Sequence, residues 1–336
     1  MLRPTVSCAL LCVLLGLSAC DAGSEATPPA GPSVSVPPSS SSASPGSPTA
    51  SAVSSPSAAR TTPTPRPRPA PVRVSTAVRT VRHLAGSIGP RSSTSRSYRT
   101  AAAWTTERFR DLGYRVRRQV FAVPGGDSWG VPVEAGWSAN LVATSSERPQ
   151  RRPHLVVGAH LDTVPQAPGA EDNASGVGVL LAVAESVAGA RTRLPVVFVA
   201  FGAEEPRGPT DDDHHYGSRH YVSTLSVEQR RNLRGMVSLD RVGVGRVLPI
   251  CGAAGQEDRL REALLRAARR AGVAAQRCPQ NRSSDHWSFV RAGLPGVRLG
   301  STPYAGYHSP ADVPSVVDRA QLARAGRTVL AWLSAP

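Results

Sequence analysis

Three short, continuous apolar runs punctuate the middle of the chain, at residues 154–160, 194–200 and 236–240. Runs of this length that lack polar alternation are typical of strands buried on both faces of a sheet. The segment 114–123 alternates apolar and polar residues and predicts an edge strand. Together these segments predict an open α/β sheet.

Other segments carry apolar residues at helical spacing and predict helices that pack on this sheet. They are residues 74–85, 98–112, 257–271 and 320–333. The stretch 172–188 is apolar, rich in small residues and opens on an Asp-Asn pair, which predicts a buried helix that starts just after Asp172. No internal repeat and no second domain are evident.

Each buried run leads into one or two polar residues. The first ends at His160, the second is followed by Glu204 and Glu205, and the third ends at Asp240. Ligand sites in open α/β sheets gather at the carboxyl ends of the strands, so we expect these side chains to share one crevice. Asp172, at its helix start, faces the same edge. Singly such residues are common in solvated turns, but their joint occurrence after apolar runs predicts a site.

The candidate residues are imidazoles and carboxylates, with no thiolate among them. His308, in the motif YHSPAD, completes the set. Such ligands suit zinc or another divalent first-row ion. Two ions about 3.5–4 Å apart can share a bridging carboxylate and leave coordination positions open for water and substrate. The sequence therefore predicts a two-metal hydrolase site.

Five motifs, GAHLD, AEDNASG, AFGAEE, SLDRVG and YHSPAD, resemble those of the M28 zinc aminopeptidases over residues 75–334. The resemblance implies the phosphorylase/hydrolase-like zinc exopeptidase fold, a mixed, mostly parallel central β-sheet flanked by helices on both faces. It also implies a peptidase that removes N-terminal residues from peptides, using two Zn²⁺ or other divalent ions.

The resemblance further implies a role for each site residue. His160 and Asp240 would hold one ion, Glu205 and His308 the other, and Asp172 would bridge them. Glu204 corresponds to the general base, which takes a proton from the attacking water and returns it to the leaving amine. Asp162 would accept the second ring N–H of His160, and Tyr307 would donate to the developing oxyanion.

Two segments near these motifs need separate interpretation. In SDHWSFVRAGLP, Asp285 and His286 are taken as a helix N-cap sequence rather than extra ligands. The stretch PRGPTDDDHHY after Glu205 is longer and more polar than the family pattern. We expect His214 and His215 to lie in an exposed loop, which with residues 211–213 either rims the substrate entrance or binds a cation.

Three other functions fit parts of the pattern. Glutaminyl cyclases share the fold and use one zinc, but they differ in the triplet after the bridging aspartate, where this chain has Asn173, Ala174 and Ser175. A carboxypeptidase or an M20-type metallohydrolase is a closer alternative, although the latter lacks the DNASG form. A binding protein without a metal site is disfavoured because every ligand and the base are present.

The net charge is +15, and all 39 basic residues are arginine. Nucleic acid is not expected as a partner, because aromatic residues make up only 5% and the arginines are dispersed. We expect peptide substrates and a monomer. The basic surface is compatible with anionic envelope polymers or lipid headgroups.

The N-terminus resembles a bacterial lipoprotein signal. Residues 1–19 combine one arginine with an apolar run too short to span a bilayer, and the sequence LSAC ends at Cys20. Lipidation of Cys20 would anchor the protein to the outer face of the cytoplasmic membrane; the alternative is ordinary secretion. The rest of residues 20–72 is a Ser/Pro/Ala-rich stretch that predicts a disordered tether, which leaves residues 73–336 as the catalytic domain.

Two cysteines, Cys251 and Cys278, remain in the predicted catalytic domain. In an oxidising compartment we expect them to form a disulfide, with two buried free thiols as the alternative.

Overall fold

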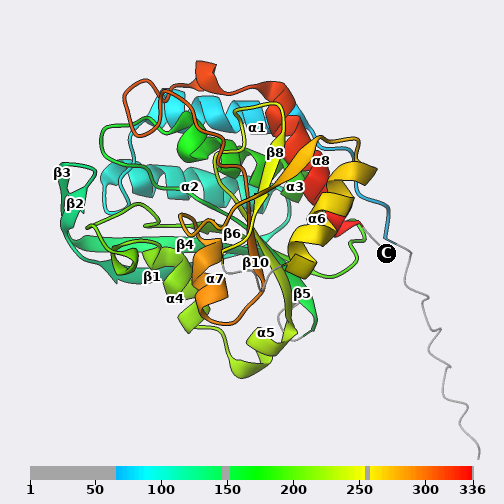
Figure 1. Ribbon diagram of the computed structural model, residues 1–336. Coiled ribbons are helices and arrows are strands. Elements are labelled where there is room, and N and C mark those ends of the chain that lie inside the picture. The colour runs from blue at the N-terminus through cyan, green and yellow to red at the C-terminus, as the bar shows by residue number, and fades with distance from the viewer. Residues whose placement is uncertain (1–65, 146–151, 254–257, 335–336) are drawn as a thin grey trace, which may run out of the picture. The chain divides into compact units, whose positions relative to one another are not determined.

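A computed structural model describes residues 66–145, 152–253 and 258–334 of the chain. An eight-stranded sheet lies at its centre, with strand order β1-β4-β6-β5-β7-β10-β8-β9 (Figure 1). Its strands are β1 (Arg115–Val123), β4 (Gly136–Thr144), β5 (His154–His160), β6 (Val196–Phe201), β7 (Leu233–Leu239), β8 (Leu248–Cys251), β9 (Ala275–Cys278) and β10 (Gly296–Leu299). A separate two-stranded hairpin is made by β2 (Gly126–Ser128) and β3 (Val131–Val133).

The centre of the sheet is parallel and its flanks are mixed. β6, β5, β7 and β10 run parallel, whereas β4 is antiparallel to β6, β1 to β4, and β8 to β10. The predicted mixed, mostly parallel sheet is therefore confirmed, and segment 114–123 does form an edge strand. The four parallel strands end side by side, which places the residues that follow them along one edge of the sheet.

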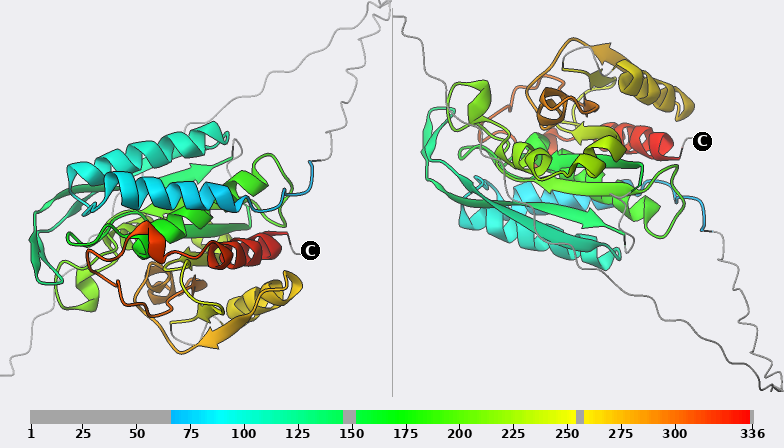
Figure 2. Two further views of the ribbon diagram at one scale, coloured as in Figure 1. Left: turned by 90° about the horizontal axis from the view of Figure 1, so that it is seen from above. Right: turned by 90° about the horizontal axis from the view of Figure 1, so that it is seen from below.

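Helices cover both faces of the sheet, as predicted (Figure 2). One layer contains α1 (Val74–Val81), α2 (Arg96–Asp111), α3 (Gly176–Val187), α6 (Asp258–Arg270) and α8 (Arg319–Leu333). The opposite layer contains α4 (Tyr216–Ser223) and α7 (His286–Arg291), which pack on each other, and α5 (Val227–Asn232) links α4 to β7. The predicted helix at 74–85 stops at Val81 and continues as a π-helical segment, η1 (Arg82–Ile88).

Side chains of the central strands point alternately to the two faces of the sheet, so each strand contributes to the core under both helical layers. In β6, Phe198 points into the larger core under α1, α2 and α3, where it meets Tyr114 edge to face. Phe201 points the other way and packs against Tyr221 and Phe289 from α4 and α7. Successive side chains of a strand point to opposite faces, so one apolar strand serves both layers. Burial on both sides explains the absence of polar alternation in these runs.

The predicted signal at residues 1–19, Cys20 and most of the predicted tether lie outside the described residues. The last part of the predicted tether segment, residues 66–72, is described and lies against the folded domain. Ala70 N–H donates to Ser186 O (2.9 Å), and Arg191 N–H donates to Pro67 O (2.8 Å). Within the described ranges, no helix is both long and apolar enough to cross a bilayer.

Cys251 and Cys278 form a disulfide between β8 and β9, where they are opposite each other in register with Cα atoms 4.8 Å apart. The bond closes a loop with a sequence separation of 27 and ties the short strand β9 to the sheet. We expect the Cys251→Ala/Cys278→Ala double variant to lose about 3–4 kcal/mol of unfolding free energy, because the open loop gains entropy in the unfolded chain. Urea unfolding of the oxidised protein and the variant measures this difference, and equal midpoints would contradict it.

Candidate metal centre

The carboxyl ends of β5, β6 and β7 bring the predicted ligands together. β5 lies between the other two strands, with His160 paired to Phe201 of β6 and Gly158 to Ser238 of β7. The chain beyond β6 turns at once to deliver Glu204 and Glu205, and β7 is followed by Asp240. His160, Glu205 and Asp240 are all at most 5% exposed. Parallel pairing thus places residues from three distant segments at one point.

Asp172 reaches the same point from the segment before α3. The π-helical segment η3 (Ala170–Ser175) is interrupted at Asp172 and Asn173, whose backbone angles are not helical, and the peptide bond between them is cis. Asp312 holds this segment, because its carboxylate accepts hydrogen bonds from the N–H groups of Glu171 (2.8 Å) and Asp172 (3.1 Å). The Asn173 side chain donates to Leu239 O (2.8 Å), which fixes the segment to the end of β7.

The two carboxylate oxygens of Asp172 face two different histidines. Oδ1 lies 3.1 Å from His160 Nε2, and Oδ2 lies 3.3 Å from His308 Nε2. The same His308 nitrogen is 3.5 Å from Glu205 Oε2, and the His160 nitrogen is 3.8 Å from Asp240 Oδ1. Asp172 therefore stands between a His160/Asp240 pair and a Glu205/His308 pair.

Unpartnered buried atoms test whether these residues suit a metal ion. Glu205 Oε1 is buried without a hydrogen-bond partner, and His160 Nε2 and Asp240 Oδ1 make no hydrogen bond although each has a charged side chain within 3.1 Å. Two groups, His160/Asp172/Glu205 and His160/Glu204/Asp240, each bring their ligand atoms within 4.8 Å of one another. Buried polar atoms normally have partners, so unsatisfied imidazole and carboxylate atoms that converge are those expected of a metal site.

The electrostatics of the centre also favour cations. Burial raises the pKa of Glu204 to about 7, and burial together with Asp172 raises the pKa of Glu205 well above its ordinary value. Burial would lower the pKa of His160, but Glu204 and the other surrounding carboxylates outweigh it and raise that pKa. Too many negative groups lie too close together to remain charged unaided. Divalent ions would relieve this repulsion.

Asp162 connects β5 to the turn that carries the glutamates. Its two carboxylate oxygens accept hydrogen bonds from the N–H groups of Glu204 (3.1 Å) and Glu205 (3.2 Å). His160 Nδ1 lies 3.2 Å from the Asp162 main-chain oxygen and 3.8 Å from its carboxylate. The His160 ring is therefore closer to the main-chain oxygen of Asp162 than to its carboxylate. The carboxylate instead holds the turn that carries Glu204 and Glu205.

Tyr307 and His308 stack on each other on the loop opposite the strand ends, with ring centroids 3.7 Å apart. Trp129, from the β2–β3 turn, packs edge-on against His308, and the Arg241 guanidinium lies over the Tyr307 ring at 4.4 Å. Together with Asp172, Glu205 and Asp240 these side chains line a cavity of about 80 Å³. Tyr307 remains 38% exposed at its mouth, where a bound substrate can reach it.

Backbone strain is concentrated around this cavity. Six described non-glycine residues have positive φ: Trp129, Ala203, His215, Arg241, Ser301 and His308. Four of them line the cavity, Ala203 directly precedes Glu204, and Ser301 accepts a hydrogen bond from Arg241. Left-handed backbone costs an L-residue roughly 1–2 kcal/mol, so its repeated use here indicates that side-chain placement outweighs local stability.

Residues 140–333 match the sequence pattern of peptidase family M28. The match covers more than half of the chain and includes every predicted ligand. The chain belongs to peptidase family M28.

Curated relatives match part of this chain. It is 31% identical over 205 residues to aminopeptidase YwaD of Bacillus subtilis, a match that covers 58% of this chain and 44% of the relative. It is 27% identical over 187 residues to the probable lipoprotein aminopeptidase LpqL of Mycobacterium tuberculosis, covering 50% of this chain and 34% of that protein. The matched region thus spans less than half of each relative.

Solved structures show the same fold. The zinc aminopeptidase BSAP of Bacillus subtilis superposes with a TM-score of 0.69 at 19% identity, covering 78% of this chain and 94% of that one. A Bacteroides thetaiotaomicron glutaminyl cyclase bound to N-acetylhistamine superposes with a TM-score of 0.68 at 20% identity, covering 80% and 100%.

Two buried arginines of this M28 family member were not predicted from its sequence. Arg91 donates to five main-chain oxygens, among them Leu161 O (2.7 Å) and Pro168 O (2.7 Å), and so ties together the loop between His160 and Asp172. Arg298 of β10 lies 3.0 Å from Asp240 Oδ1 and is 1% exposed. Arg298 is the main influence that lowers the pKa of Asp240 to about 2, against the opposing effect of burial.

Two expectations for the neighbouring segments are wrong. His215 is not in an exposed loop: it is 4% exposed, its Nε2 lies 3.2 Å from Glu204 Oε1, and burial lowers its pKa to about 3. Asp285 does not cap α7 with its side chain. It precedes the helix with helical backbone angles, and its carboxylate is fully buried without a hydrogen-bond partner. Burial and the nearby Glu204 raise the pKa of Asp285.

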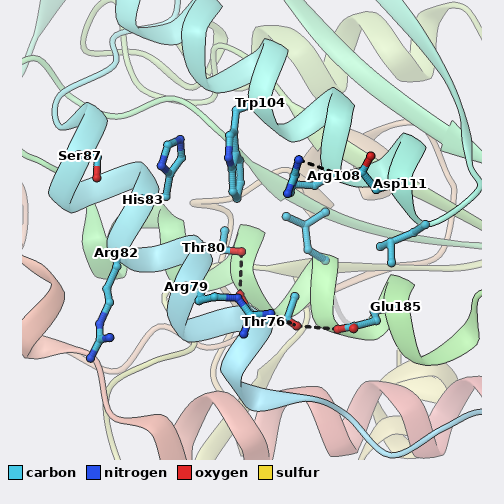
Figure 3. A pocket seen from close by; sticks show the side chains of 12 residues that line it. Thr76, Arg79, Thr80, Arg82, His83, Ser87, Trp104, Arg108, Asp111 and Glu185 are labelled. Atoms are coloured by element: carbon cyan, nitrogen blue, oxygen red, sulfur yellow. Dashed lines mark hydrogen bonds and ion pairs between the residues drawn. The ribbon is translucent and has the colours of Figure 1, made fainter.

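A larger cavity, of about 490 Å³, lies away from this centre between α1, η1 and α2 (Figure 3). Its polar groups pair mainly with one another: Thr76 donates to Glu185 (2.6 Å), and Arg108 pairs with Asp111 (2.8 Å). His83 stacks on Trp104 at 4.4 Å. No metal-binding cluster among the described residues falls in this cavity.

Proposed function

We propose that this protein is an exported, zinc-dependent aminopeptidase that hydrolyses the N-terminal residue from peptides. One observation carries the proposal: the two oxygens of Asp172 face His160 and His308 at 3.1 and 3.3 Å, the arrangement that a carboxylate shared by two ions requires. The names of relatives such as aminopeptidase YwaD support the same activity.

The proposed ligands divide into two sets around Asp172. His160 and Asp240 would hold one zinc ion, and Glu205 and His308 the other. When bound, zinc supplies Lewis acidity to the scissile carbonyl and makes water more acidic. The protein's own contribution is to fix these ligands, through Asp312 behind Asp172 and Arg298 behind Asp240.

Three side chains would carry the proton and charge movements. Glu204, with its pKa raised to about 7, is suited to take a proton from the attacking water and to return it to the leaving amine near neutral pH. Tyr307, at the cavity mouth, would donate a hydrogen bond to the carbonyl oxygen as negative charge develops there. Asp162 would hold the turn that carries Glu204 in place.

The size of the cavity supports exopeptidase action. A volume of about 80 Å³ accommodates little more than a terminal residue. So small a cavity leaves little room for a blocking group on the terminal nitrogen, so we expect a peptide with a blocked N-terminus to bind less well.

A glutaminyl-cyclase-like activity is the second candidate, because solved cyclases share this fold over their whole length. Such an enzyme closes an N-terminal glutamine on itself and releases ammonia, so the two candidates give different products from one Gln-initiated peptide. A carboxypeptidase or a non-catalytic binding protein on the same fold would release no N-terminal residue.

We also propose that the protein acts outside the cytoplasm, anchored by a lipidated Cys20 and carried on the segment that follows. The LSAC sequence and the lipoprotein name of the relative LpqL support this location. Labelling cells with a radioactive or clickable fatty acid tests it, since a Cys20→Ala variant should take up no label.

Amino-acid release from matched free and N-acetylated peptides tests the activity. We expect the purified protein to cleave only the free-amine peptides, to lose activity in chelator and to regain it with zinc. Mass spectrometry of a Gln-initiated peptide distinguishes the two reactions. Hydrolysis releases free glutamine and a shorter peptide, whereas cyclisation leaves a peptide of the same length that has lost about 17 mass units, the mass of ammonia. No reaction of a fully zinc-loaded protein with any of these peptides would reject the proposal.

A further inference from the structure

The polar insertion after Glu205 folds back onto the centre. Arg207 N–H donates to Asp213 O (2.8 Å), and Arg291 from α7 pairs with Asp212 (2.8 Å). At the far end, a Cβ on Gly217 would clash with the carbonyl oxygen of Gly202, so this glycine allows the chain to pass directly against the end of β6. The insertion therefore returns to within reach of the residues that follow β6.

His215 is the residue that this path places beside Glu204. Its N–H donates to Glu204 O (2.9 Å), and its backbone is left-handed, with φ 58°. Its side chain is 5% exposed and its Nε2 lies 3.2 Å from Glu204 Oε1, with no hydrogen-bond partner elsewhere. A strained, buried residue whose Nε2 approaches a single carboxylate oxygen is placed for that carboxylate.

The two oxygens of Glu204 consequently have different surroundings. Oε1 faces His215, whereas Oε2 faces the metal centre, 3.9 Å from His160 Nε2. A carboxylate acts as a directed base only if its rotation is restricted, and a third group that orients the base is a recurrent feature of hydrolytic sites.

We propose that His215 is a positioning residue for the general base: its neutral ring donates Nε2–H to Glu204 Oε1 and leaves Oε2 directed at the attacking water. The proposal rests on the proposed function, because it takes Glu204 as the base. The insertion that departs from the M28 pattern is thereby assigned a role inside the active site.

Three substitutions test the role kinetically. His215→Leu keeps the bulk of the residue but removes the donor, and we expect kcat to fall about 10- to 100-fold with KM changed less than about twofold. His215→Gln places an amide N–H near the position of Nε2 and should recover part of kcat. His220→Leu, on α4 and stacked on Phe121 away from the cavity, is the matched control and should retain wild-type kinetics.

Metal content and melting temperature are measured for each variant. Unchanged kcat in His215→Leu, or a fall in kcat that parallels lost zinc or lost folded protein, would overturn the proposal. So would equal activities of the Leu and Gln variants, since only the Gln side chain restores a donor.

A spectroscopic readout separates this inference from the activity itself. In ¹⁵N-histidine-labelled protein we expect His215 to be the neutral Nε2–H tautomer, with an Nε2 resonance that shifts in Glu204→Gln. The Nδ1–H tautomer, or no shift, would reject the contact even if the enzyme is an active aminopeptidase. The expected spectra together with an inactive, zinc-loaded wild-type protein would reject the proposed function and retain the contact.

Discussion

Glu204→Gln should lower kcat by about 10²- to 10⁴-fold while both metals stay bound, because an amide cannot take a proton from water. Glu204 is 7% exposed and burial holds its pKa near 7, so the wild-type group exchanges protons readily at neutral pH. Glutamine has the same shape and still accepts from His215, so little structural change is expected. Steady-state kinetics with metal analysis of the same samples measures the effect.

A matched substitution controls for loss of charge. Glu185→Gln removes a carboxylate that pairs with Arg73 (2.7 Å) and Thr76 (2.6 Å) beside the larger cavity. This variant should keep full activity. If Glu204→Gln retained a tenth or more of wild-type kcat, or lost metal in proportion to its activity, Glu204 would not be the general base.

Arg298→Met should destabilise the metal-free protein by about 3–5 kcal/mol, because it leaves the buried carboxylate of Asp240 without its charged partner. Arg298 also donates to Ser283 O (2.8 Å) and to Asn281 Oδ1 (3.1 Å), so the loop before α7 loses hydrogen bonds as well. Zinc should recover part of the stability, since a bound cation replaces the missing positive charge at Asp240 and binds only the folded state. Urea unfolding in chelator and in excess zinc measures both quantities.

Arg277→Met is the control for removing an arginine from an ion pair. Arg277 pairs with Glu262 at the surface, where its side chain is 52% exposed, and such pairs contribute about 0–1 kcal/mol. A similar loss for both variants, or a loss at Arg298 that zinc does not reduce, would show that the Asp240 contact is not the source of the effect.

Much of the ligand geometry was predictable because it follows from parallel strands. His160 ends an apolar run, and Asp240 comes directly after another, so knowing that these runs form neighbouring strands is enough to bring them together. Asp172 was predictable for a similar reason, as the acidic residue before a buried helix. These inferences need only the local pattern and the rule for where binding sites lie in such sheets.

Residues that act through long-range contacts gave no comparable signal. Arg298 lies in the four-residue strand GVRL, where an arginine suggests an exposed position, and its burial is explained only by distant partners, Asp240 and the loop before α7. Arg91 binds main-chain oxygens, which any sequence could supply. His215 follows exposed acidic residues and is buried because the end of the insertion returns to the residues that follow β6.

Strand β4 was not predicted for a related reason. Its apolar pattern is interrupted by Asn140, which is fully buried in the structure. The Asn140 amide donates to Gly217 O (2.8 Å) and accepts from Gly202 N–H (3.1 Å), so its polar atoms are satisfied by distant backbone. A polar residue inside a sheet is compatible with burial once such partners exist, and a single sequence does not reveal them.

The open sheet leaves two strand edges, and the described chain protects both. β1 carries Arg115, Arg117 and Arg118 at exposed positions, and like charges along an edge oppose its pairing with the same edge of another copy. At the other side β9 is only four residues long and is fastened to β8 by the disulfide, which leaves little backbone to recruit a foreign strand. Many copies crowded onto one surface would therefore meet without presenting a free strand edge on which aggregation could start.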